Sequence, residues 1–214
     1  DDRRSHALVE RMREDIIPGA SGTARLTTLV GGGPAQNHDF VEAVGGALPV
    51  VIALVMALTF LVLVVLFRSI VLPLKAVVMT LLSALAAYGV LVAVFQWGWL
   101  SGLLGFTPLD HVTAWVPPFL FSMLFGLSMD YEVFLLTRIR ERLDATGDQH
   151  HAIAWGVARS GRIITAAAAI MVVVFLAFVS SRLVPIKEAA LGMAVAVLID
   201  ATLVRIVLVP AFMS

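Results

Sequence analysis

The chain has 214 residues, of which 60% are hydrophobic and 14% charged, and its formal net charge is zero. An ordinary soluble domain carries about 25% charged residues, so this composition excludes a typical soluble protein and indicates a membrane protein. The balanced charge gives no reason to expect a nucleic-acid partner, and the absence of cysteine excludes disulfides and thiol chemistry.

The first 42 residues are predicted to form a small α+β segment. A helix is expected over 5–16, ended by Pro18, and a strand over 24–30. The Gly-Gly-Gly-Pro run at 31–34 predicts a turn, because it lacks the Lys-Ser/Thr of a phosphate-binding loop. Since this segment is too small to fold alone, we expect it to complete a larger extracytoplasmic domain that precedes Asp1 in a longer protein.

Residues 43–214 are predicted to form the membrane domain of an all-α polytopic membrane protein. No charged residue lies between Glu42 and Arg68, and about 20 apolar residues cross a bilayer core of roughly 30 Å as a helix. Four further apolar stretches follow, the fourth span being short. The five predicted spans cover 47–67, 76–95, 116–137, 163–179 and 189–212.

Basic residues are distributed unevenly between the two sides of this domain. One side has only Arg182 and Lys187. By the positive-inside rule the other side is cytoplasmic, which places the N-terminal segment outside and the C-terminus in the cytoplasm of a multi-pass plasma (inner) membrane protein. That cytoplasmic side carries seven basic residues: Arg68, Lys75, Arg138, Arg140, Arg142, Arg159 and Arg162.

An amphipathic helix is predicted over 149–162, at the cytoplasmic interface between the third and fourth spans. Apolar residues recur there at helical spacing, and two arginines lie near its end. His150 and His151 are adjacent, so on a helix their side chains point about 100° apart and do not easily share a metal ion. We therefore predict no metal site and no cofactor.

Asp130 is a carboxylate inside the third span, where a charge costs about 2.5 to 3.5 kcal/mol on insertion scales. It lies eight residues before Arg138, hence about 12 Å from the cytoplasmic edge at about 1.5 Å per residue. Ser122 and Gly126 share its helix face at i, i+4 spacing. This small-residue face predicts that another helix packs closely against it.

Asp200 is the corresponding carboxylate in the fifth span, where Gly192 and Ala196 repeat the same spacing. The third and fifth helices are therefore predicted to pack together through these two faces. Arg205 follows five residues later, about 140° around the helix, so it is a poor direct partner for Asp200. The alternative to a functional role for Asp200 is a structural ion pair that fixes helix packing.

Asp130 is interpreted as a proton carrier, because burial favours its neutral form and a nearby cation or hydroxyl favours its anion. Tyr131 can donate a hydrogen bond to a carboxylate on a neighbouring helix, and Glu132 is a candidate helix-helix contact or supporting ion pair. The alternative is a static, hydrogen-bonded acid at position 130.

The third span carries a long, specific motif. Residues 125–136 read FGLSMDYEVFLL and continue into RIRE at 138–141. This stretch resembles the signature of the MMPL family (mycobacterial membrane protein large) of resistance-nodulation-division transporters. The resemblance covers essentially the whole chain, with further matching segments at 66–69 (LFRS), 72–75 (LPLK), 160–165 (SGRIIT), 200–205 (DATLVR) and 209–211 (VPA).

The resemblance implies the C-terminal half of a proton-motive-force-driven exporter of lipids or other hydrophobic molecules. Members of that family have twelve spans in two similar halves, and an Asp-Tyr pair in each half forms the proton relay. Asp130-Tyr131 matches the second pair. The implied partners are the lipid bilayer, a hydrophobic or lipid substrate and the N-terminal half of the same transporter, and a homo-oligomer is compatible with the sequence.

Two alternative functional classes are a non-transporting relative and a membrane enzyme. A non-transporting relative of the same superfamily, such as a Patched-like protein or an accessory secretion membrane subunit, would share the spans without proton-coupled flux. A membrane enzyme is disfavoured, because no extracytoplasmic Ser-His-Asp set, metal cluster or carboxylate pair is evident in the sequence. We therefore predict that the chain is not an enzyme and that the proton is its coupling ion.

Overall fold

A computed structural model describes residues 2–21, 28–108 and 111–208. These residues form helices and connecting loops, and no strand occurs among them. The chain divides into two compact units, residues 1–51 and residues 52–214.

The N-terminal unit opens with a run of helix in three parts. They are α1 (Asp2–Arg11), the π-helix η1 (Met12–Ile16) and α2 (Ile17–Ser21). The helical backbone continues past Pro18, where the sequence predicted an end. Pro18 is the second residue of α2 and lacks the backbone N–H that would continue the helical hydrogen bonds, and the change from η1 to α2 falls next to it.

The predicted α+β character of this unit is not supported. Residues 24–27 of the expected strand lie outside the described residues, and residues 28–30 have no regular structure. Gly32 has φ +102°, a left-handed conformation that glycine adopts without strain, and the long helix α3 (Gly33–Phe67) begins directly after it. The turn predicted at 31–34 thus leads into a helix whose first residues complete the unit.

Among the described residues, four helices are long and apolar enough to cross a membrane. The first is α3, and the second is α4 (Val71–Leu91) with its π-helical continuation η2 (Val92–Gln96). The third is α6 (Val116–Thr146), and the fourth lies in α7 (Gln149–Phe178). Each overlaps one of the first four predicted spans.

A fifth span is not supported in the form that the sequence predicted. The predicted stretch 189–212 begins inside α8 (Val184–Ile199), which has only 16 residues in all, and from Asp200 the backbone continues as the π-helix η3 (Asp200–Leu208). Residues 209–214 lie outside the described part. The switch in hydrogen bonding at Asp200 therefore divides what the sequence presents as one apolar run.

The connections between the helices contain two further features. The helix predicted at 149–162 and the predicted fourth span are one continuous helix, α7, whose N-cap Asp148 accepts a hydrogen bond from His151 N at 3.0 Å. Between η2 and α6 the loop carries one short helix, α5 (Ser101–Leu104).

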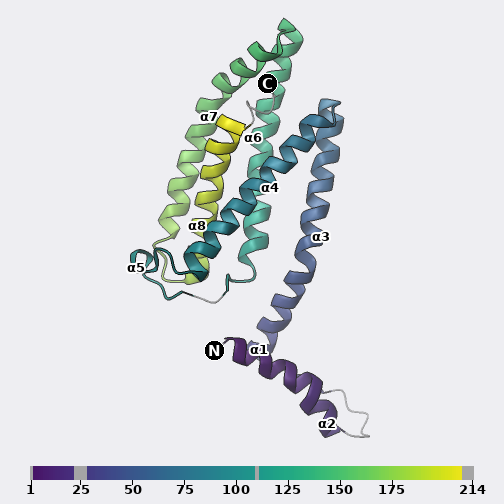
Figure 1. The fold of residues 1–214 in the computed structure, drawn as a ribbon, viewed down its shortest axis with the longest axis vertical. Helices are drawn as coiled ribbons and strands as arrows, with labels where there is room; N and C mark the ends of the chain where they lie inside the picture. The colour runs from purple at the N-terminus through teal and green to yellow at the C-terminus, as the bar shows by residue number, and fades with distance from the viewer. Residues whose placement is uncertain (1, 22–27, 109–110, 209–214) are drawn as a thin grey trace. The chain divides into compact units, whose positions relative to one another are not determined.

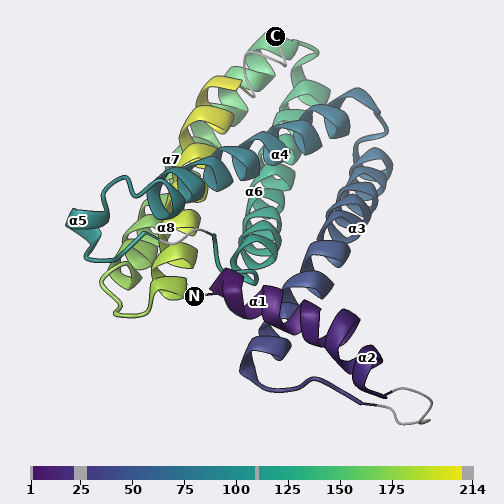
Figure 2. The same cartoon turned by 60° about the horizontal axis from the view of Figure 1, so that its bottom comes forward.

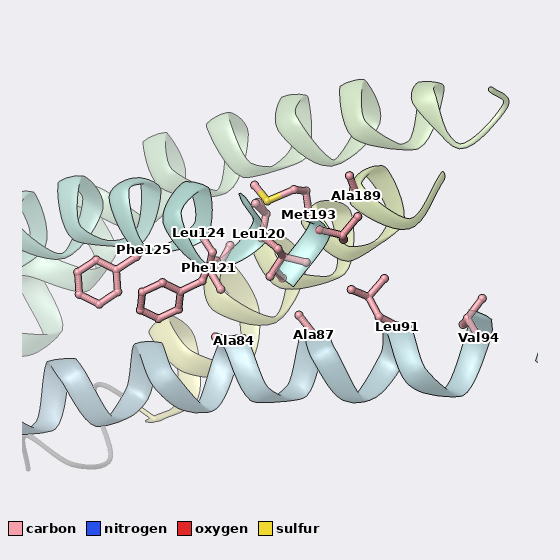
Figure 3. Close-up of a cluster of buried hydrophobic side chains, with 14 of the residues drawn as sticks. Ala84, Ala87, Leu91, Val94, Leu120, Phe121, Leu124, Phe125, Ala189 and Met193 are labelled. Atoms are coloured by element: carbon pink, nitrogen blue, oxygen red, sulfur yellow. The ribbon is translucent and has the colours of Figure 1, made fainter. Parts of the chain in front are cut away.

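The membrane bundle of the second unit has its core between α4, α6 and α8. In Figure 1, α6, α7 and α8 lie side by side and α4 crosses them. Figure 2 shows the same bundle turned by 60°. Figure 3 shows Leu91 of α4, Leu124 of α6 and Met193 of α8 in one cluster of buried apolar side chains, and each is at most 1% exposed. Large apolar side chains on the outer faces of α3 and α7 are exposed instead, as expected of helices that contact lipid.

Candidate functional site

The two intramembrane carboxylates of the sequence lie in different surroundings. Asp200, the first residue of η3, is only 6% exposed, whereas Asp130 of α6 is exposed. The structure therefore separates two residues that the sequence presented as equivalent. Asp200 belongs to the interior of the bundle, and Asp130 belongs to its outer surface.

Packing between α6 and α8 explains this difference. On α8 the small-residue face is buried, and a Cβ added to Gly192 would lie 2.4 Å from Leu120 Cδ1 of α6. On α6, however, Ser122 and Gly126 are exposed, and a Cβ on Gly126 would meet nothing within 4 Å. The structure thus brings α6 and α8 together through the face of Leu120 and Leu124, not through the face of Ser122, Gly126 and Asp130.

A small cavity lies where α6, α7 and η3 meet, and Tyr131 and Asp200 both line it. Its volume is about 10 Å³, close to the minimum that holds one water molecule. Tyr131 Oη also donates to Met171 Sδ of α7 at 4.0 Å, a weak contact between the two helices. The cavity is lined by Leu124, Leu127, Ser128, Tyr131, Ile164, Ala168, Val197, Asp200 and Ala201.

Asp130 and Tyr131 are adjacent in sequence but lie in different surroundings. Asp130 exposes a carboxylate on the outer face of α6, and Tyr131 lines the cavity that Asp200 also lines. Asp200 also begins a π-helical segment, a distortion often found at functional sites. The side chains of Glu132 and Arg205, named in the sequence as candidate ion-pair partners, lie outside the described part.

A second polar cluster, which the sequence did not indicate, fixes the loop between η2 and α6. Lys187 and Glu188 of α8 are 7% and 0% exposed. Lys187 Nζ donates to the backbone carbonyl oxygens of Leu104 and Gly105, and Glu188 Oε2 accepts from Thr113 N at 3.0 Å. One turn of α8 therefore holds the loop at two points.

Burial raises the pKa of Glu188, a shift that the hydrogen bonds from Thr113 reduce. Glu188 lies outside the four candidate spans and one residue before the predicted fifth. A carboxyl group in such surroundings is costly to ionise. Lys187 and Glu188 lie at the edge of an apolar run, where charged residues are ordinary, so the sequence offered no signal that they are buried.

A larger cavity of about 410 Å³ opens near the turn between α3 and α4. Its walls are mainly apolar, and Lys75, Arg140 and Asp144 contribute charged groups. Arg140 Nη1 donates to Phe67 O at 2.7 Å and so satisfies a carbonyl group at the C-terminal end of α3. The next residue, Arg68, has φ +48°, so this turn contains a strained residue as well as a bound guanidinium group.

Known proteins match nearly all of this chain. The MMPL family model matches residues 5–214. "Heme uptake protein MmpL11" of Mycobacterium tuberculosis is 48% identical over 92% of the chain, and "Mycolic acid-containing lipids exporter MmpL11" of Mycolicibacterium smegmatis is 45% identical over all of it. "Trehalose monomycolate exporter MmpL3" of Mycobacterium tuberculosis is 42% identical over 88% of the chain.

These matches cover 20%, 22% and 20% of the three relatives, so the chain spans about one fifth of their length. The range of this chain that the family model matches contains the apolar helices, the FGLSMDYEVFLL motif and both carboxylates. The family that the motif predicted is therefore confirmed, and the chain belongs to the MMPL family.

Proposed function

We propose that this chain is the C-terminal half of the membrane domain of a proton-driven exporter of lipids or other hydrophobic molecules, and that Asp130 and Tyr131 are part of its proton relay. The observation that carries the proposal is that two adjacent residues of α6 lie in different surroundings. Asp130 is exposed on the outer face, and Tyr131 faces the small cavity that it shares with the buried Asp200.

The exposure of Asp130 supports a partner on this face. A carboxylate on the lipid-facing side of a membrane helix costs about 2.5 to 3.5 kcal/mol, so a protein surface is expected to cover it. Ser122 and Gly126 are exposed on the same face and allow close approach of another helix. We propose that the N-terminal half of the transporter docks there and brings its own carboxylate close to Asp130.

The cargo is proposed only as a class. Two of the relatives are named as exporters of lipids, and a third is named for heme uptake, so their names agree on a hydrophobic molecule and differ in its identity and direction. One charge that crosses 100 mV releases about 2.3 kcal/mol, whereas exposing a chain of roughly sixteen carbons costs about 13 kcal/mol at about 0.8 kcal/mol per CH₂. The extracytoplasmic domain must therefore shelter the cargo while the membrane helices supply the movement.

The test is proton-gradient-driven efflux from proteoliposomes that contain a full-length transporter with this C-terminal sequence. Asp130→Asn keeps the shape of the side chain and its hydrogen bonding but cannot titrate, so it should abolish efflux. Tyr131→Phe should reduce efflux less completely, because the carboxylate remains. Asp144→Asn, an exposed carboxylate at the far end of the same helix, is the matched control and should be silent.

Near-normal efflux from Asp130→Asn at matched protein levels would refute the relay. Absence of any gradient-dependent flux in the intact transporter would instead favour the non-transporting alternative. The two results are distinguishable, because the first needs an active wild type and the second shows that there is none.

A further inference from the structure

Two histidines that are far apart in the sequence meet in the N-terminal unit. His6 of α1 and His38 of α3 have their Nδ1 atoms 3.4 Å apart, and their rings lie edge to face with centroids at 5.1 Å. Two nitrogen ligands that each lie about 2.0 to 2.1 Å from a tetrahedral Zn²⁺ ion are about 3.3 to 3.4 Å apart. The separation of these two imidazoles is therefore that of two ligands of one ion.

The second nitrogen of each ring also lies near a partner. His6 Nε2 lies 3.3 Å from the side-chain amide of Asn37, and His38 Nε2 lies 4.0 Å from Glu42 Oε2. A rotation of the Asn37 amide by about 180° exchanges its oxygen and nitrogen, so the amide can present its oxygen to the His6 ring. In metal-binding histidines an acceptor that is hydrogen-bonded to the other nitrogen fixes the ring and its tautomer. The amide lies within hydrogen-bond distance of His6, whereas Glu42 lies at ion-pair distance from His38.

The carboxylates nearby define two ways to place an ion, because ligand atoms of His38, Asp39 and Glu42 all lie within 4.8 Å of one another. Asp39, however, is bound at both oxygens by Arg13, with Oδ2 at 2.9 Å from Nη2. A carboxylate that is already paired with a guanidinium group is a poor ligand, and the guanidinium charge opposes a second cation. This favours the pair of Nδ1 atoms over a site built on His38 Nε2, Asp39 and Glu42.

We propose that His6 and His38 bind one divalent transition-metal ion through their Nδ1 atoms, with Glu42 orienting His38 from its other nitrogen and water completing the coordination. Imidazole ligands suit Cu²⁺, Ni²⁺ and Zn²⁺, whereas Mg²⁺ and Ca²⁺ prefer oxygen ligands. The bound ion joins α1 to the first turns of α3 and so closes a loop of about thirty residues. It is a structural clip at the point where the chain enters α3, independent of the proton relay proposed for α6.

The experiment is calorimetric titration of the untagged 214-residue chain in detergent micelles, after removal of metals with a chelator. Zn²⁺ should bind at one ion per chain, Cu²⁺ more tightly, and Mg²⁺ should not bind. His6→Gln and His38→Gln should each abolish this binding, and far-UV circular dichroism should show unchanged helix content. Glu42→Gln should weaken binding about 10- to 100-fold without abolishing it.

The matched controls use the remaining histidines of the chain, at positions 111, 150 and 151. His111→Gln and the double variant His150→Gln/His151→Gln should keep the full affinity. Full affinity in His6→Gln would overturn the proposal in favour of the site on His38, Asp39 and Glu42. No binding to the wild type would also overturn it and would leave the two rings as a hydrogen-bonded pair.

Discussion

Tyr131 of α6 and Asp200 of η3 line the same small cavity in the membrane bundle, although the FGLSMDYEVFLL motif contains only the first of them. The two residues come from helical segments that are joined by α7 and α8 along the chain. Their shared cavity links the motif to the C-terminal segment. The carboxylate of Asp200 is buried, whereas that of Asp130 is exposed. Because of this difference in burial, substitutions at Asp200 and Asp130 should change the stability of the protein by different amounts.

Asp200→Ala is expected to destabilise this chain, and Asp130→Ala is not. Removing a buried polar side chain that lines a cavity leaves neighbouring polar groups without their partner, at a cost of about 1 to 3 kcal/mol. Asp130 is exposed, so its replacement should change stability by about 0.5 kcal/mol or less. Thermal unfolding of both variants in the same detergent measures the difference, and equal effects would contradict the burial described above.

Glycine substitutions on the two small-residue faces, at Gly192 of α8 and Gly126 of α6, should have opposite effects on stability. A methyl group at Gly192 would collide with Leu120 and crowd Leu91, so Gly192→Ala should cost about 1 to 3 kcal/mol. Gly126→Ala has open space and replaces glycine within a helix, which should stabilise the isolated chain by up to about 1 kcal/mol. In an intact transporter Gly126→Leu should instead impair efflux, because the proposed docking of the N-terminal half needs close approach there. Unfolding midpoints and efflux rates test the two statements separately.

The pattern of apolar residues predicted most of the membrane helices of this fold. It did not predict which faces of these helices pack against one another. Runs without charge located the membrane helices, and single carboxylates within them identified Asp130 and Asp200. The sequence predicted that the Ser122-Gly126-Asp130 face of α6 packs against the fifth span, and the structure uses the Leu120 face instead. The sequence does not distinguish the two faces, because Leu120 suits lipid as well as a protein core. Small residues at Ser122 and Gly126 mark a surface for close packing without saying which helix uses it.

Other features depended on contacts between distant parts of the chain. His6 and His38 meet only because α1 and the start of α3 fold together, and no spacing rule connects positions so far apart. Pairing of Lys187 with the carbonyl groups of the loop is likewise tertiary. The α+β expectation failed because it relied on a short β-branched run, and short runs do not distinguish a strand from an irregular connection.

Glu188 should make the stability of the bundle depend on pH. Burial raises its pKa in the folded protein, so folding favours the protonated acid. This contribution is fully present below the ordinary pKa and is lost as the pH rises through the raised value. Glu188→Gln keeps an oxygen that accepts from Thr113 N and removes the titration. The variant should therefore gain stability relative to the wild type as the pH increases from about 4 to 8.

Melting temperatures of both proteins across that pH range provide the measurement. Glu141→Gln removes an exposed carboxylate that pairs with Arg138 and is the control, for which a nearly constant difference is expected. If the difference between Glu188→Gln and the wild type also stayed constant with pH, folding would not shift the pKa of Glu188, and burial would not favour its protonated form.

Orientation in the membrane can be tested cleanly because the chain contains no cysteine. Ala145, near the end of α6, and Gly102, in the short helix α5, are both exposed and lie at opposite ends of α6 along the chain. The seven basic residues near the α3–α4 and α6–α7 connections predict that Ala145 faces the cytoplasm and Gly102 the outside. A membrane-impermeant maleimide should therefore label Gly102→Cys in intact cells and Ala145→Cys only after permeabilisation. Because both positions are exposed, weak labelling cannot be attributed to burial in the protein, and the reverse pattern would invert the proposed direction of export.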